Sequence, residues 1–205
     1  KDRILLTVSG GADSVAMLHL FSQTNFHLGI AHCNFHLRGE ESDQDEELVN
    51  KLAKEYKLPW FRVDFNTTAY ASEHGISIEM AARELRYTWF EKIRSENNYH
   101  YIATAHHQDD LIETFFINLT RGTGIRGLTG FRPKKEKLIR PMLFANREAI
   151  MEYVLREKLE YREDSSNSDV KIIRNKFRHQ ILPAFLEINP AFRQNILESI
   201  DNLHD

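Results

Sequence analysis

Short apolar runs rich in β-branched residues alternate along the chain with longer segments in which apolar residues recur at helical spacing. The runs predict strands over Ile4–Val8, Leu28–His32, Trp60–Phe65 and Tyr101–Ala105. A fifth strand is predicted over Lys137–Leu143. Because Pro141 interrupts this last run, we expect that strand at an edge of the sheet.

Helices are predicted between and after these strands. One helix follows the second strand, where Ser42 is a candidate N-cap and Leu48, Leu52 and Tyr56 form an apolar face. The others cover Val15–Phe21, Ser77–Asn97, Asp110–Leu119, Arg147–Lys158, Asn175–Glu187 and Ala191–Leu203. Strands that alternate with helices predict an α/β fold with a doubly wound, five-stranded parallel sheet. We expect residues 1–145 to form a nucleotide-binding core and residues 146–205 a C-terminal helical extension of the same catalytic domain.

The composition narrows the class of protein. The chain has 205 residues, 41% of them apolar, and no run approaches the roughly 20 apolar residues of a membrane span. The first residues do not resemble a signal peptide, so no membrane association and a cytoplasmic location are expected. Cys33 is the single cysteine, which excludes an internal disulfide, a cysteine-based zinc site and a two-cysteine sulfur relay.

Charge is distributed unevenly. The formal net charge of −3 gives no bulk attraction to nucleic acid, so a nucleic-acid partner would need a local patch. The run Glu40–Glu47 is acidic. Basic residues gather in two places, one with Arg126, Arg132, Lys134, Lys135, Lys137, Arg140 and Arg147, the other with Lys171, Arg174, Lys176 and Arg178. Each basic cluster is either a contact for RNA phosphates or a merely solvated face.

A loop of small and polar residues separates the first predicted strand from the first predicted helix. It reads Ser9, Gly10, Gly11, Ala12, Asp13 and Ser14. Adjacent glycines let backbone N–H groups approach an anion, and the helix N-terminus adds unpaired donors. The serine hydroxyls are further donors, and the Asp13 carboxylate suits Mg²⁺. The loop predicts a phosphate site, with an ordinary strand–helix turn as the alternative.

A second polar motif follows the fourth predicted strand and enters a helix. Asp110 and Glu113 lie at i, i+3 and so share one face of that helix. A capping box is the alternative interpretation. One acid would satisfy a cap, whereas Asp109, Asp110 and Glu113 beside His106 and His107 favour a functional site. The role of the two histidines stays open.

Six stretches resemble a known family. The SGGxDS pattern after a first strand is typical of the PP-loop ATP pyrophosphatases, which have a Rossmann-like fold, cleave ATP between the α and β phosphates and transfer AMP to an oxygen. The remaining stretches resemble the tRNA(Ile)-lysidine synthetases of that superfamily. They are His32–Gly39, Ala82–Tyr87, Thr104–Gly122, Arg140–Leu143 and the block from Tyr161 through Glu163–Asn167 to Arg178. Family members continue into C-terminal tRNA-binding domains, which are expected to be absent here.

The resemblance implies a reaction and roles. Free L-lysine would be ligated to C2 of the wobble cytidine of tRNA(Ile) with a CAU anticodon, through an adenylated base, with release of pyrophosphate and AMP. The resulting lysidine changes decoding from AUG to AUA. ATP and Mg²⁺ are the implied cofactors, and a homodimer is left open. The implied sites are Ser9–Ser14, His32 and Arg83 for ATP, Asp13 and Asp109 for Mg²⁺, and Asp110 and Glu113 for lysine.

The resemblance also implies roles for basic residues. Arg86, Arg174 and Arg178, together with Lys134 and Lys135 of the basic cluster, are the candidate tRNA contacts. The predicted catalytic set is Asp13, Arg83, Asp110, Glu113, Arg174 and Arg178. Arg174 and Arg178 lie at i, i+4, so both are expected on one side of a helix.

Other functions explain fewer of these residues. Thiouridine and thiocytidine synthases share the loop but need several cysteines, and synthetases that form NAD would leave the other stretches unexplained. A metal-dependent phosphohydrolase could use His106, His107, Asp109 and Asp110 as ligands, but would leave Ser9–Ser14 without a role. A non-catalytic nucleotide-binding module of the same fold is the last alternative.

Overall fold

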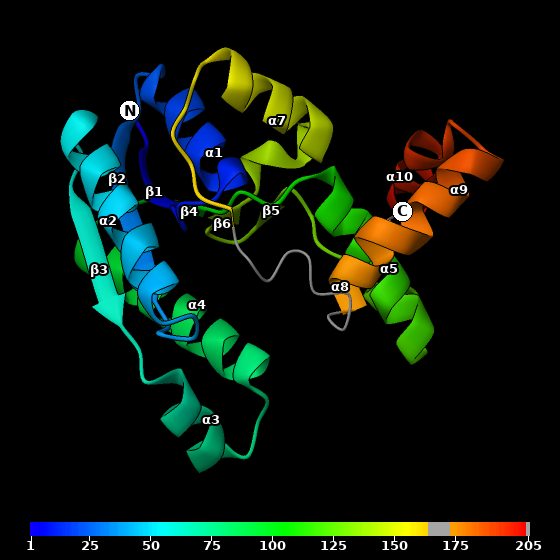
Figure 1. The fold of residues 1–205 in the computed structure, drawn as a ribbon, viewed down its shortest axis with the longest axis horizontal. Coiled ribbons are helices and arrows are strands. Elements are labelled where there is room, and N and C mark those ends of the chain that lie inside the picture. The colour runs from blue at the N-terminus through cyan, green and yellow to red at the C-terminus, as the bar shows by residue number, and fades with distance from the viewer. Residues whose placement is uncertain (164–172, 204–205) are drawn as a thin grey trace.

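A computed structural model describes residues 1–163 and 173–203, and its centre is a twisted sheet (Figure 1). The strands are β1 Arg3–Thr7, β2 His27–Asn34, β3 Trp60–Asp64, β4 Tyr101–Ala103, β5 Lys134–Lys135 and β6 Leu138–Ile139. Their order is β3-β2-β1-β4-β6-β5, with every neighbouring pair parallel except β5 and β6. The α/β fold and the mainly parallel sheet are confirmed. The prediction of five strands is wrong, because the sheet has six.

Helices cover both faces of the sheet. Their bounds are α1 Ala12–Ser22, α2 Glu40–Glu55, α3 Thr67–His74, α4 Ile78–Glu96, α5 Gln108–Arg121, α6 Ile125–Leu128, α7 Arg147–Arg156, α8 Ile173–Lys176, α9 Leu182–Ile188 and α10 Phe192–Asn202. A 3₁₀ turn covers Pro141–Phe144 and a π-helical turn Phe177–Ile181.

The core follows from the alternation of side chains along β1. Ile4 and Leu6 point to one face, where they join a cluster with residues of α1, α2 and α7, while Leu5 points to the other face and packs with Phe90 of α4. The doubly wound arrangement is therefore confirmed. Strand β1 pairs with β2 on one side and with β4 on the other, so the strand order reverses between β1 and β4. Such a reversal is where open parallel sheets bind ligands.

The fifth predicted strand was too long. Only Leu138–Ile139 of the predicted Lys137–Leu143 is strand, and the 3₁₀ turn begins at Pro141. Proline has no N–H for a sheet, which ends the pairing there. The outer edge is formed instead by the antiparallel two-residue strand Lys134–Lys135. The tight connection passes through Glu136, which has a positive φ of 53°.

Helix starts also differ from expectation, and helices α3 and α6 were missed. Helix α1 begins at Ala12, three residues before the predicted Val15. Helix α2 begins at Glu40 after Gly39, so Ser42 is not its N-cap; the Ser42 hydroxyl accepts from the Arg38 N–H instead. Helix α5 begins at Gln108, two residues before the predicted start at Asp110. Helix α3 was not predicted. Its local signals are the Asn66 cap, whose side chain accepts from the Ala69 N–H, and a left-handed glycine at its end.

The described residues after Asn146 form helices α7 to α10 and the π-helical turn, joined by non-helical connections at 157–163 and 189–191. Helix α7 packs beside α1, and its residues Ile150 and Val154 belong to the core cluster. Helices α8 to α10 lie beside α5 at one end of the molecule (Figure 1). The predicted boundary between residues 145 and 146 stays a prediction. Within residues 1–163 and 173–203, no helix combines the length and apolar character that crossing a bilayer requires.

Candidate functional site

The glycine-rich loop follows β1 and leads into α1, as predicted. Gly10 has φ of +97°, a conformation that glycine adopts without a Cβ penalty. The loop is closed by Ser14, whose hydroxyl donates to the Gly11 carbonyl at 2.9 Å and accepts from the Ser9 N–H at 3.1 Å. Asp13 lies in the first turn of α1. The loop therefore forms a compact strand–helix corner with its acid at the helix start.

A cavity of about 350 Å³ opens beside this loop, at the ends of β1 and β4. The predicted site residues that line it are Ser9, Gly11, Asp13, Ser14, Arg86, Asp110 and Arg174. The structure thus brings residues of the glycine-rich loop, of the α5 motif and of two other segments, which contain Arg86 and Arg174, to one cavity. The remaining predicted residues lie outside its lining.

His32 lines a neighbouring cavity of about 410 Å³, which shares Ser9 and Arg86 with the first. Burial lowers the pKa of His32, so its imidazole is neutral. The ring Nδ1 lies 2.8 Å from the Val8 carbonyl oxygen and so carries the hydrogen, which leaves Nε2 as a buried acceptor with no hydrogen-bond partner among the described residues. Burial also lowers the pKa of Arg86, which lies 5.1 Å from the centre of the Phe35 ring.

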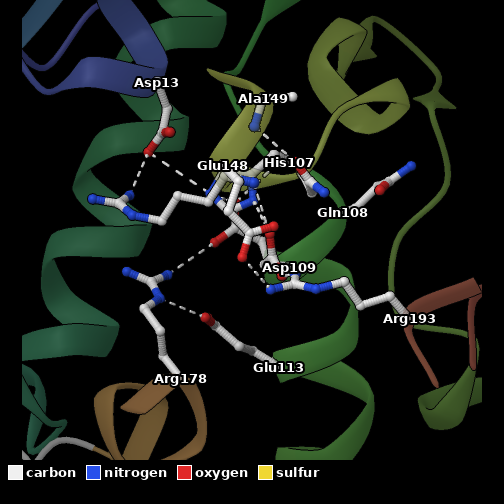
Figure 2. A network of polar contacts seen from close by, with 12 residues as sticks. Asp13, His107, Gln108, Asp109, Glu113, Glu148, Ala149, Arg178 and Arg193 are labelled. Atoms are coloured by element: carbon white, nitrogen blue, oxygen red, sulfur yellow. Dashed lines mark hydrogen bonds and ion pairs between the residues drawn. The ribbon is translucent and has the colours of Figure 1, made fainter. Parts of the chain in front are cut away.

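The two acids of α5 contact an arginine. Glu113, at 1% exposure, accepts from Arg178 Nε at 2.8 Å, and Asp110 lies 3.9 Å from Arg178 Nη2 (Figure 2). Burial raises the pKa of Glu113, and the Arg178 charge opposes that rise. Asp110 also accepts from the His107 N–H at 3.0 Å. The capping box at the start of α5 therefore pairs His107 with Asp110, not Asp110 with Glu113 as in the alternative interpretation, and it leaves Glu113 unexplained.

The two histidines have different surroundings. Burial lowers the pKa of His106 to about 4, and its Nδ1 lies 2.8 Å from the Thr104 hydroxyl. His107 lies among carboxylates (Figure 2). Its Nε2 is 3.7 Å from Asp13 and 3.6 Å from Asp110, and its Nδ1 is 3.7 Å from Asp109. His107 therefore links the glycine-rich loop to the start of α5.

Asp109 contacts two later helices. One of its oxygens accepts from the Arg147 N–H at 2.8 Å, and the other forms an ion pair with Arg193 of α10. The Arg147 side chain reaches back to Asp13 at 3.3 Å. The second oxygen of Asp13 is buried and has no hydrogen-bond partner among the described residues. Sequence reasoning missed these roles of Arg147 and Arg193, because neither belongs to a local motif.

The other predicted residues lie farther out. Arg83 lies over the Tyr87 ring at 4.9 Å and lines a separate surface pocket. Lys134 and Lys135 are exposed on β5 at the sheet edge. Asp164–Asn167 and Lys171 lie outside the described residues. In the part of the chain that the structure describes, no three His, Cys, Asp or Glu side chains gather in a way that would hold a metal ion.

The fold and the loop define an α/β protein of the open, mainly parallel class with a glycine-rich strand–helix corner after its first strand. A family model described as a PP-loop domain matches residues 1–185. The chain belongs to this family of PP-loop domains.

Relatives with similar sequences carry one name. A tRNA(Ile)-lysidine synthase of Bacteroides thetaiotaomicron is 50% identical over 204 residues, 100% of this chain and 48% of that protein. The enzymes of the same name from Porphyromonas gingivalis W83 and Petrotoga mobilis are 48% and 40% identical, over 98% and 95% of this chain and 44% and 63% of their own lengths. The chain thus spans about half the length of the first of these relatives.

Solved structures share the fold. The U34-tRNA thiolase NcsA of Methanococcus maripaludis has a TM-score of 0.79 at 19% identity, covering 99% of this chain and 72% of that one. The NH3-dependent NAD synthetase of Campylobacter jejuni has a TM-score of 0.58 at 14% identity, covering 98% and 82%. At these identities the likeness concerns the fold alone.

Proposed function

We propose that this chain is the catalytic part of a tRNA(Ile)-lysidine synthase. It would use ATP to adenylate the oxygen on C2 of the wobble cytidine in tRNA(Ile) with a CAU anticodon. The amino group of free lysine would then displace AMP and form lysidine. The observation that carries the proposal is the single cavity in which Ser9, Gly11 and Asp13 of the loop meet Asp110 and Arg174. The relatives named tRNA(Ile)-lysidine synthase, which match nearly the whole of this chain, support the choice of reaction.

The loop fits the phosphates of ATP. Gly10 and Gly11 carry no side chain that would keep an anion from the backbone, and α1 directs its N-terminus to the same corner. Adenylation transfers AMP from ATP to the cytidine oxygen and releases pyrophosphate, so this oxygen leaves later as part of AMP. The neutral His32, with a buried acceptor nitrogen in the adjoining cavity, supports its proposed contact with the nucleoside.

Asp13 is the better supported of the two proposed Mg²⁺ ligands. One of its oxygens is buried without a donor among the described residues, and a carboxylate oxygen left so is suited to a cation. Mg²⁺ is usually held by one or two carboxylates together with phosphate oxygens, and it neutralises phosphate charge. Asp109 stays a proposal, since its two oxygens already meet the Arg147 N–H and Arg193.

Asp110 and Glu113 would bind an ammonium group of lysine. Arg178 compensates part of their negative charge, and one oxygen of Glu113 is buried without a hydrogen-bond partner in residues 1–163 and 173–203. An ammonium group beside these carboxylates would gain charge-assisted hydrogen bonds. Arg86 and Arg174, which line the cavity, would contact the cytidine or its phosphate, and Arg83 and Arg178 would support them from its surroundings.

A thiolase reaction is disfavoured by the single cysteine. Burial raises the pKa of Cys33 to about 12, so its thiol stays protonated at neutral pH and is a poor sulfur nucleophile. The structural likeness to the thiolase therefore extends to the fold and carries no sulfur chemistry.

The central experiment is ATP–pyrophosphate exchange with an unmodified tRNA(Ile) transcript that has a CAU anticodon. We expect exchange that depends on this transcript, and release of AMP only when lysine is added. A transcript with a different wobble base is the matched control. Equal exchange with both transcripts, or none with a folded chain, would contradict the proposal.

Asp110→Asn and Glu113→Gln separate the two half-reactions. Each keeps the size of the side chain and removes its charge. A charge-assisted hydrogen bond contributes about 1.5–3 kcal/mol, so lysine affinity should fall roughly tenfold or more, while exchange without lysine is retained. Loss of exchange with unchanged lysine affinity would mean that these acids serve the nucleotide.

The tRNA contact at β5 is tested by salt dependence. Reversing both charges in Lys134→Glu/Lys135→Glu should weaken tRNA binding and flatten the plot of log affinity against log salt by about 0.7 to 0.9 per lost phosphate contact. Lys54→Glu/Lys57→Glu makes the same charge change at two exposed positions elsewhere and is the control. If the two double variants have identical slopes, Lys134 and Lys135 belong to a solvated face and do not contact the tRNA backbone.

A further inference from the structure

The acidic run Glu40–Glu47 is not simply a solvated face. Asp45 turns inward from α2, and its side chain is 11% exposed. One carboxylate oxygen accepts from Arg38 Nη2 at 2.7 Å, and the other accepts from Arg162 Nε at 2.8 Å. Arg162 also donates to the Gln44 side chain at 2.6 Å. Asp45 therefore joins two segments that are far apart in the sequence.

These segments enclose the glycine-rich loop. The backbone N–H of Arg162 donates to the Gly10 carbonyl at 3.0 Å. On the other side, a methyl group at Gly10 would lie 3.4 Å from the Asp45 carbonyl oxygen and 3.5 Å from its Cβ. Gly10 thus passes between Asp45 and Arg162, and the ion pair between those two residues closes the enclosure.

This contact controls a backbone donor. The Gly10 carbonyl and the Gly11 N–H belong to one planar peptide, so they point in opposite directions. Holding the carbonyl toward Arg162 directs the Gly11 N–H away from it, to the side of the Ser9 hydroxyl 3.4 Å away. Ser9 and Gly11 both line the cavity of about 350 Å³. Rotation of this peptide would replace the donor with a carbonyl oxygen, which repels an anion.

We propose that Asp45 and Arg162 are positioning residues for phosphate binding, which hold the Gly10–Gly11 peptide so that its N–H group faces the terminal phosphates of the nucleotide. The proposal rests on the proposed use of ATP and adds two residues to it. Both residues act on the phosphates through Gly10. Asp45 also lines the cavity of about 410 Å³ beside His32, whereas Arg162 is not among the described residues that line it.

Calorimetric titration of the whole chain with two probes tests this role. Pyrophosphate, in the presence of Mg²⁺, tests the loop, and adenosine tests the nucleoside pocket without phosphate contacts. Asp45→Asn keeps the size of the side chain but removes its charge and one acceptor. We expect it to weaken pyrophosphate binding about tenfold, which corresponds to about 1.4 kcal/mol. The comparison with adenosine rests on Arg162→Gln, which should weaken adenosine binding less than twofold, because Arg162 is not among the described residues that line the cavity beside His32. A residue with only a structural role would affect both probes alike.

Matched variants complete the design. Glu47→Gln makes the same charge change at an exposed position of α2 and should bind both probes like the wild type. Arg162→Gln should reproduce Asp45→Asn, and Arg162→Lys should recover part of the loss because it retains the charge. Thermal melting verifies that each variant is folded, and the Arg162 pair provides the test if Asp45→Asn does not fold.

The outcomes separate the two proposals. If Asp45→Asn and Arg162→Gln bind pyrophosphate as tightly as the wild type does, the positioning role alone is overturned. Equal loss of pyrophosphate and adenosine binding in Arg162→Gln would also overturn it. A folded wild type that does not bind pyrophosphate would overturn the use of ATP together with the positioning role.

Discussion

Arg193→Ala should destabilise the fold far more than removal of a surface charge. Arg193 extends from α10 toward α5 and forms an ion pair with Asp109 (Figure 2). Asp109 is 3% exposed, so the carboxylate that the substitution leaves behind cannot be hydrated. Its remaining described hydrogen bond comes from the Arg147 N–H.

The magnitude follows from burial. Breaking a buried ion pair by removing one partner costs about 3–5 kcal/mol. The Arg193 side chain is 20% exposed and Asp109 keeps one donor, so we expect about 3 kcal/mol, the lower end of that range. Arg156→Ala is the control, since this side chain is 69% exposed and its ion pair with Glu157 should contribute about 0–1 kcal/mol.

Urea denaturation of both variants measures the difference. A further variant, Arg193→Met with Asp109→Asn, removes the stranded charge and should recover part of the stability, because Asn retains an acceptor for the Arg147 N–H. If Arg193→Ala unfolds at the same urea concentration as Arg156→Ala, the ion pair is not structural and this reasoning is refuted.

Three other predictions concern Gly29, Cys33 and His106. Gly29→Ala should lower the free energy of unfolding by about 1–3 kcal/mol, because the new methyl group would lie 2.0 Å from the Tyr99 hydroxyl. Gly124→Ala, where nothing lies within 4 Å, is the control, and equal melting temperatures of the two variants would contradict this. The pKa of about 12 predicts that iodoacetamide labels Cys33 at pH 8 only after denaturation, as intact mass would show, whereas rapid labelling of the folded chain would contradict it. The pKa of His106 is lowered to about 4 from its ordinary 6.5, so protonation of this imidazole should destabilise the folded state increasingly as pH falls from 6.5 to 4. The loss of stability over this pH range should be smaller in His106→Gln, and an NMR titration midpoint of His106 near 6.5 would refute this.

The parts of the fold that sequence predicts best are those with strong local patterns. Strands β1 and β2 are apolar runs buried on both faces, and the loop Ser9–Ser14 lies between a strong strand and a strong helix. The outer edge was harder, because β5 and β6 have two residues each and their pairing depends on the turn at Glu136. A two-residue strand has no periodicity from which it could be recognised.

The candidate site divides in the same way. The loop and the acids of α5 carry local signatures, and Asp13 and Asp110 meet at one cavity. Asp45 could not be distinguished from its acidic neighbours by sequence, since only its contact with Arg162, 117 residues later, sets it apart. Arg147 similarly reaches Asp13 over 134 residues. Such long-range pairs depend on the packing of the helices on the sheet and have no local signal.

Strand β1 occupies the middle of the sheet, and this position affects how the chain is made. Its partner β2 follows within about 20 residues, but β4 begins only at Tyr101. At synthesis rates of about 5–20 residues per second, the second edge of β1 stays unpaired on the order of ten seconds. Leu5 and Leu6, both fully buried in the finished fold, lie on that open strand. An apolar strand edge invites pairing with other chains. The interval between synthesis of β1 and of β4 is therefore the stage at which the nascent chain is most prone to aggregate.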